Sequence, residues 1–168
     1  GSGHLGVARL LLEAEADPWF KVTAANSQMK DGDTALVLAC GGGFEECVDL
    51  LLSLRASVNE VNSSKGYTPL HCAAKWGRVN MVQFLTEHNA DVAARDYEGI
   101  TPLHDAAKFG YCDVIDKLLE LKADFWAKDD SGRTVIEVAE QEDEPEAAAH
   151  LQALEVELLA ERGGDAIC

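Results

Sequence analysis

Four threonines recur along this chain at nearly constant spacing: Thr34, Thr68, Thr101 and Thr134 lie 34, 33 and 33 residues apart. The middle two belong to nearly identical stretches, 66–77 and 99–110, which share the order Thr-Pro-Leu-His-x-Ala-Ala-Lys followed by an aromatic residue and glycine. A sequence with a fixed period of this length folds as similar units, and each unit is too small to bury its apolar face alone. The chain is therefore predicted to stack its repeats into one continuous core.

Each full copy of the stretch predicts a tight turn followed by a short helix. Gly66 can adopt the backbone angles of a turn, and the Thr68 hydroxyl can accept a bond from a first-turn N–H as an N-cap. Pro69 then suits the first helical position, where an N–H is not needed. Gly77 is expected to end the helix after about two turns.

The period, together with Thr-Pro-Leu-His-x-Ala, resembles the ankyrin repeat. Weaker copies begin at Gly32 and Gly132, so the resemblance covers nearly the whole chain. It implies an all-α solenoid of helix–turn–helix repeats with β-turn fingers, forming one domain over residues 3–168. The expected units are a half repeat with an extended loop at 3–30, repeats at 31–64, 65–97 and 98–128, and an acidic C-terminal capping repeat at 129–164.

The first expected unit departs from the pattern. Residues 3–17 resemble only the second helix of a repeat, which favours a fragment of a longer array over a chain that starts with half a repeat. The following connection carries about seven extra residues within 18–30, including Trp19 and Phe20. Added loops are surface features that are sometimes functional, and the sequence leaves open whether this one is a neutral insertion.

Two other segments give specific expectations. Three consecutive glycines, 41–43, predict a flexible and poorly capped end for the first helix of the 31–64 repeat. Pro145 is expected to begin the last helix. The apolar side of that helix is predicted to consist of Leu151, Leu154, Leu158 and Leu159.

The charge is strongly negative and unevenly spread. The chain has 30 acidic and 14 basic residues, a net charge of −16, and residues 129–168 carry −10 of it. Such a field repels nucleic acid and anionic membranes and attracts basic partners. No apolar run is long enough to span a membrane. The five cysteines show no paired spacing, which favours reduced thiols and an intracellular location, cytoplasmic or nuclear.

No pattern typical of an enzyme is present. Walker, Rossmann, zinc-protease, Gly-x-Ser-x-Gly and Cys-x-x-Cys motifs are all missing, so no catalytic, cofactor or metal site is predicted. His71 and His104 occupy the third helical position of the repeated stretch. By the resemblance, we expect their imidazoles to tie neighbouring repeats together. The acidic run at 140–146 lacks the ligand spacing of a calcium loop.

The resemblance implies that turn tips and the ends of first helices face a concave groove. Large aromatics surrounded by charge are typical of interaction hot spots. An aromatic centre flanked by lysines is predicted there, with acidic ends formed by Asp31 and Asp33 on one side and by Asp130 and Glu140 on the other. The predicted partner-binding residues are Asp33, Tyr67, Lys75, Trp76, Tyr97, Ile100, Lys108, Phe109 and Arg133.

These features favour a non-enzymatic scaffold or adaptor, a monomer or part of a hetero-complex, that binds a protein partner. The partner segment would supply apolar anchors and acidic groups at the centre of the groove and basic residues at its ends; neither nucleic acid nor membrane is expected as a partner. Two alternatives stay open. The chain could be a regulatory or targeting segment of a larger enzyme. It could also be an acidic chaperone for basic proteins, whose binding would fade with salt and survive loss of the aromatics.

Overall fold

The structure is a computed structural model that describes residues 33–53 and 55–164. The expectations for the 3–30 unit, for its Trp19 and Phe20, and for Asp31 lie outside the described residues. Within those residues the chain is all α-helical, as predicted, with no extended strand. The helices are α2 (Ala35–Gly42), α3 (Glu45–Ser53), α4 (Pro69–Lys75), α5 (Val79–Glu87), α6 (Pro102–Lys108), α7 (Cys112–Glu120), α8 (Val135–Gln141) and α9 (Pro145–Gly164).

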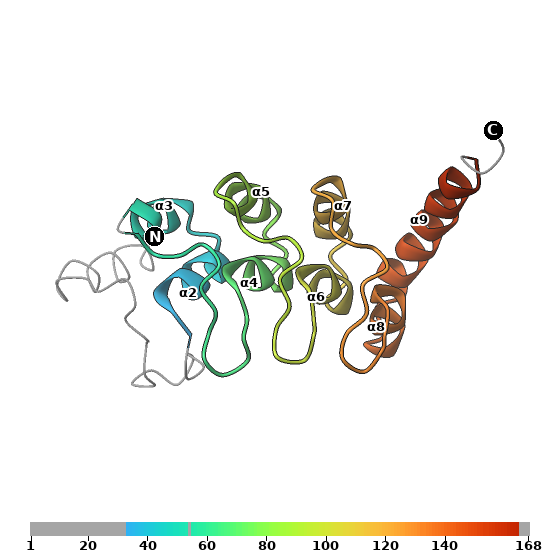
Figure 1. Ribbon diagram of the computed structural model, residues 1–168, viewed down its shortest axis with the longest axis horizontal. Helices are drawn as coiled ribbons and strands as arrows, with labels where there is room; N and C mark the ends of the chain where they lie inside the picture. The colour runs from blue at the N-terminus through green and yellow to red at the C-terminus, as the bar shows by residue number, and fades with distance from the viewer. Residues whose placement is uncertain (1–32, 54, 165–168) are drawn as a thin grey trace.

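The helices form two rows (Figure 1). Helices α2, α4, α6 and α8 stack side by side, and α3, α5 and α7 form the second row, which lies above them in Figure 1. Hairpin-like fingers project from the same edge of the stack between successive repeats (Figure 1). This arrangement confirms the predicted solenoid, in which each repeat covers the apolar face of its neighbour.

Local sequence explains why each first helix begins where it does. Thr68 has an extended backbone, with φ −84° and ψ 165°, and its hydroxyl accepts a hydrogen bond from the His71 N–H. Pro69 is the first residue of α4, and Thr101 and Pro102 repeat the arrangement at α6. The predicted N-caps and helix starts are therefore confirmed.

The core runs through the stack as a layer of leucines and small residues. Leu70 and Leu103, which follow the prolines, are buried, and so are the alanine pairs 73–74 and 106–107. Small side chains on facing helices allow close approach of the helix axes. No helix among residues 33–53 and 55–164 combines the length and the apolar character needed to cross a bilayer.

The structure corrects two expectations. The end of α2 is well capped: Gly43 is left-handed, at φ 75°, and its N–H bonds to the Ala39 and Cys40 carbonyls. The glycine run therefore ends the helix in an ordered turn. On α9, Leu151 is fully buried, but Leu159 is 52% exposed because the helix extends past α8 into solvent (Figure 1).

Two finger glycines provide a matched test of the turns. Gly66 and Gly132 both have positive φ, 78° and 82°, but an added Cβ meets Tyr97 Cδ1 at 2.6 Å only at Gly66 and meets nothing within 4 Å at Gly132. We expect Gly132→Ala to lower the free energy of unfolding by about 1 kcal/mol through backbone strain alone. Gly66→Ala should lower the free energy of unfolding by about 2 kcal/mol, because the Tyr97 ring must also move. Urea denaturation measures both, and equal losses would contradict this account of the fingers.

Candidate functional site: a groove between the first helices and the fingers

At the centre of the predicted groove, a lysine lies between two aromatic rings. Trp76 and Phe109 are the C-cap residues of α4 and α6, and Tyr67 precedes α4 on its finger. The Lys75 ammonium lies 5.2 Å from the Tyr67 ring centroid and 5.4 Å from that of Phe109. Both distances allow cation–π attraction. Three of the predicted residues, which come from two repeats, therefore cluster at the Lys75 ammonium.

The predicted aromatics differ in exposure. Trp76 is 56% exposed and Tyr97 64%, whereas Tyr67 and Phe109 are half-buried. The Tyr97 N–H donates to the Lys65 carbonyl at 3.0 Å, which joins neighbouring fingers. Of the two aromatic residues that cap the ends of α4 and α6, Trp76 is therefore the exposed one.

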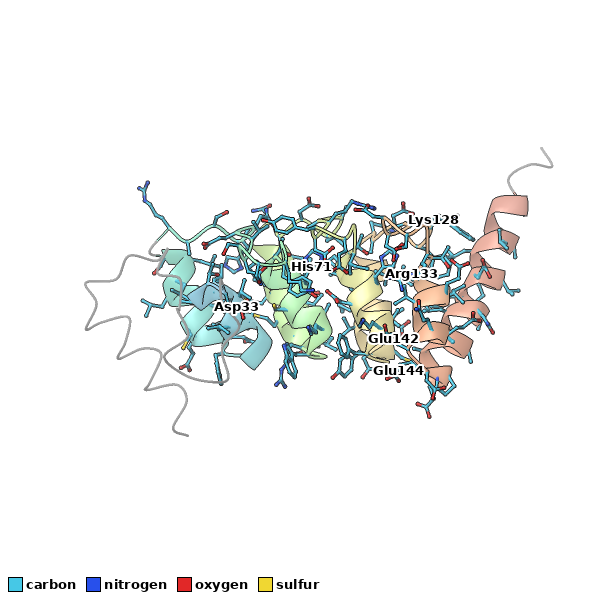
Figure 2. All side chains as sticks on the ribbon, turned by 90° about the horizontal axis from the view of Figure 1, so that it is seen from below. Asp33, His71, Lys128, Arg133, Glu142 and Glu144 are labelled. Atoms are coloured by element: carbon cyan, nitrogen blue, oxygen red, sulfur yellow. The ribbon has the colours of Figure 1, made fainter. Side chains whose placement is uncertain are left out.

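The predicted partner-binding residues at the two ends of the repeat stack, Asp33 and Arg133, form hydrogen bonds within the protein. Asp33 is 8% exposed and accepts a 2.7 Å bond from the Asn62 amide, which differs from the exposed acidic flank expected from the sequence. At the other end of the row (Figure 2), Arg133 donates to Asp129 Oδ2 at 2.7 Å and to Gln141 Oε1 at 2.5 Å. Both residues are therefore held by hydrogen bonds within the protein, Asp33 by one side chain and Arg133 by two.

Two further predicted residues already have partners within the repeats. The Lys108 ammonium lies 2.8 Å from Glu142 Oε1, at the end of α8 (Figure 2). The Ile100 carbonyl accepts a bond from His71 Nε2 at 2.9 Å, and the Ile100 side chain is half-buried. An acidic partner group that approached Lys108 would have to compete with Glu142.

The two repeat histidines have the predicted linking role. His71 Nδ1 accepts the Thr68 N–H at 3.2 Å, so Nε2 carries the proton that is donated to Ile100. His104 bonds in the same way to Thr101 and to the Arg133 carbonyl, at 3.4 and 3.3 Å. Burial lowers the pKa of both imidazoles, in keeping with this neutral tautomer.

A pocket of about 360 Å³ lies between α2 and α4 beside Trp76. Its lining includes Leu38 and Gly41 from α2 and Cys72, Lys75 and Trp76 from the other side. The later first helices carry lysine or glutamine at the position of Gly41, and a Cβ there would fall 3.0 Å from Trp76 Cδ1. The glycine therefore leaves room for this hollow.

Sequence reasoning missed Asp105, which is buried at the variable position of the repeated stretch. It is 2% exposed, and its Oδ2 has no hydrogen-bond partner among the described residues. Burial raises the pKa of this carboxyl to about 8, although the nearby Lys75 ammonium lowers it. Burial also raises the pKa of Tyr67, with a further contribution from Asp105. The substitution of Asp105 for Cys72 of the preceding copy was a signal in the sequence.

Arg78 was also missed, although it directly follows the glycine that ends the first helix. Its Nε donates to the Gly41 carbonyl at 3.1 Å, and its side chain lies against Gly43. The equivalent residues in the neighbouring repeats are Phe44 and Tyr111, so the positive charge is peculiar to this repeat. Arg78 joins Lys75 in lining the pocket beside Trp76.

Comparison with known proteins gives a consistent family assignment. The family described as ankyrin repeats (3 copies) matches residues 1–96 and 61–129. The ankyrin repeat and KH domain-containing protein mask of Drosophila melanogaster is 35% identical over 88 residues, 52% of this chain and 2% of that protein. The probable E3 ubiquitin-protein ligase XBOS33 of Oryza sativa subsp. japonica is 40% identical over 83 residues, 49% of this chain and 15% of its own length.

A third relative, protein phosphatase 1 regulatory subunit 12A of Mus musculus, is 37% identical over 63 residues, 38% of this chain and 6% of that protein. The chain thus spans only a small part of each of these relatives. The family match covers more than half of the chain, and the stacked helix pairs and Thr-Pro-Leu-His caps agree with it. This chain belongs to the ankyrin-repeat family.

Proposed function

We propose that this chain binds a segment of a partner protein in the groove, with Trp76 as the main apolar anchor. Ankyrin repeats are protein-interaction modules and are generally non-enzymatic. The observation that carries the proposal is the 56% exposure of Trp76 beside a pocket of about 360 Å³. Tryptophan is the residue type most enriched in interaction hot spots, and a pocket next to it can receive a side chain of the partner.

The expected energy of this contact is large enough to detect. Covering roughly 100 Å² of the Trp76 ring would contribute about 2–3 kcal/mol at about 25 cal/mol per Å². Tyr97, on the finger that precedes α6, adds a second exposed ring. The half-buried Tyr67 and Phe109, with Lys75 held between them, form a surface on which a peptide can lie.

The test is affinity capture from a lysate with the full chain, compared with Trp76→Ala at low and moderate salt. We expect the variant to lose the captured partner at least tenfold at both salt concentrations. The matched control is Val156→Ala, which truncates a 68% exposed side chain on α9. The control should capture as the unmodified chain does, and circular dichroism should show both variants folded.

The same experiment tests the acidic-chaperone alternative. That function predicts basic partners that dissociate with salt and bind the Trp76→Ala variant unchanged. Such a result would contradict the groove as the binding site. The alternative of a regulatory or targeting segment within a larger enzyme concerns the rest of a longer protein, and groove binding is compatible with it.

A further inference from the structure

The rim of the pocket between α2 and α4 is positive, in contrast to the chain as a whole. Its charged lining residues are Lys75, Arg78 and Asp33. The Asp33 carboxylate is buried and hydrogen-bonded to Asn62, so the two exposed or half-exposed charges are both cationic. The positive charge at this pocket contrasts with the net charge of −16 for the whole chain.

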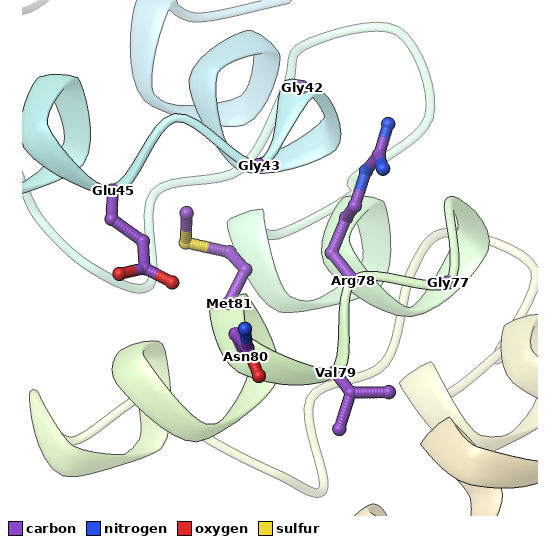
Figure 3. A pocket seen from close by; sticks show the side chains of 8 residues that line it. All are labelled: Gly42, Gly43, Glu45, Gly77, Arg78, Val79, Asn80 and Met81. Atoms are coloured by element: carbon purple, nitrogen blue, oxygen red, sulfur yellow. The ribbon is translucent and has the colours of Figure 1, made fainter.

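Arg78 is held with its guanidinium available to a ligand. Its Nε bonds to the Gly41 carbonyl, and its stem lies 3.4 Å from the position of a Cβ on Gly43, so the glycine run forms the platform for the side chain. The adjoining hollow is lined by one acidic residue, Glu45, and Arg78 extends away from it (Figure 3). Among the described residues, Arg78 forms no ion pair.

The pocket below this rim is suited to an apolar group. Leu38, Cys72 and the Trp76 ring contribute to its lining, and Gly41 makes room for it. Its volume of about 360 Å³ is near the lower end of the range of ligand pockets, roughly 300–1,000 Å³. That space accommodates one or two side chains rather than a whole helix.

We propose that this pocket takes an apolar side chain of the partner and that a carboxylate close to it in the partner sequence pairs with the Arg78 guanidinium. Guanidinium and carboxylate form two parallel hydrogen bonds, which would fix the orientation of the segment. Lys75 adds a second positive charge to the same rim. The inference rests on the proposed groove binding and specifies the chemistry of the partner at this end of the groove.

The experiment selects peptides from a random-peptide phage library on the immobilised full chain. We expect enrichment of sequences in which leucine, methionine or phenylalanine lies within two or three residues of aspartate or glutamate. A fluorescein-labelled synthetic copy of an enriched peptide is then titrated by fluorescence anisotropy. Arg78→Gln should weaken its binding about tenfold, and Arg78→Lys should weaken it less.

The matched control is Lys128→Gln, which removes the same charge from an exposed residue at the opposite end of the stack (Figure 2). It should change the dissociation constant less than twofold at moderate salt, since distant charges are screened. An equal effect of Lys128→Gln and Arg78→Gln would overturn the specific pairing. Enrichment of basic peptides, or of no sequence, would overturn the inference as well.

Trp76→Ala separates this inference from the proposed function. Basic peptides that lose binding with Trp76→Ala would leave the groove as the site and refute only the carboxylate pairing. Acidic peptides that bind Trp76→Ala and the unmodified chain equally would contradict both.

Discussion

Asp105→Ala is expected to stabilise the protein by about 3 kcal/mol at pH 7. The carboxyl has a pKa of about 8 in the folded chain, against 3.8 as its ordinary value. At roughly 1.36 kcal/mol per pH unit, keeping it protonated at pH 7 costs about 4 kcal/mol relative to the unfolded chain. Loss of its packing offsets about 1 kcal/mol of the gain.

The pH dependence of this effect has a definite sign. The folded-state pKa of Asp105 is raised, so the stability of the unmodified protein is fully present below about pH 4 and is lost as pH rises toward 8. The advantage of Asp105→Ala should therefore fall below about 1 kcal/mol at pH 5 and grow as pH rises toward 8.

Urea denaturation at pH 5, 7 and 8 measures this gain. Asp113→Ala, an exposed aspartate in α7, is the matched control and should change the free energy of unfolding by less than about 0.5 kcal/mol at each pH. Asp105→Asn, which keeps the shape of the side chain, should show the same trend with pH. A gain independent of pH would contradict a buried, protonated carboxyl.

His71→Ala is expected to destabilise the protein by about 3 kcal/mol at pH 7.5. The substitution leaves the Ile100 carbonyl and the Thr68 N–H without their imidazole partner, each in a largely buried setting. It also empties the space of a fully buried ring. Because one of the lost bonds joins neighbouring repeats, the loss weakens both the helix cap and the stack.

Two other N3 residues provide the comparison. His104→Ala should behave like His71→Ala, since His104 makes the same pair of contacts. Glu137→Ala should cost less, because Glu137 is exposed and, within the described part of the chain, its carboxylate bonds to Thr134 of its own cap. A loss at Glu137 equal to that at His71 would show that the link between repeats contributes nothing.

The histidines also predict a fall in stability at acid pH. Their folded-state pKa values are lowered by burial, so the unfolded chain takes up protons first as pH drops below about 6.5. Stability is then lost between that pH and the folded pKa. Asp105 acts in the opposite direction, so the measurement is made in the Asp105→Ala background. In that background, His71→Ala should reduce the loss of unfolding free energy that occurs as the pH falls below about 6.5.

Much of the fold was predictable because its determinants are local. The N-cap threonine, the N1 proline and the N3 histidine of each full repeat lie within four residues of one another, and the 33-residue period places each set in the same register. The helix starts and the role of the histidines therefore agree with the sequence-based prediction. Thr134 begins α8 in the same way, with Glu137 in place of histidine.

The exposure of the groove residues depended on distant neighbours, and only the tertiary structure decided it. Asp33 is buried and bonds to Asn62, 29 residues away, and Lys75 lies between two rings from different repeats. The glycine run at 41–43 suggested a loose end, but Ala39 and Cys40 cap it, and Trp76 and Arg78 pack on it. The sequence by itself determined the repeat, its caps and its charge, since these follow from residues close together. The packing of one repeat on the next determined which side chains are free to meet a partner, because that depends on contacts 29 to 37 residues apart.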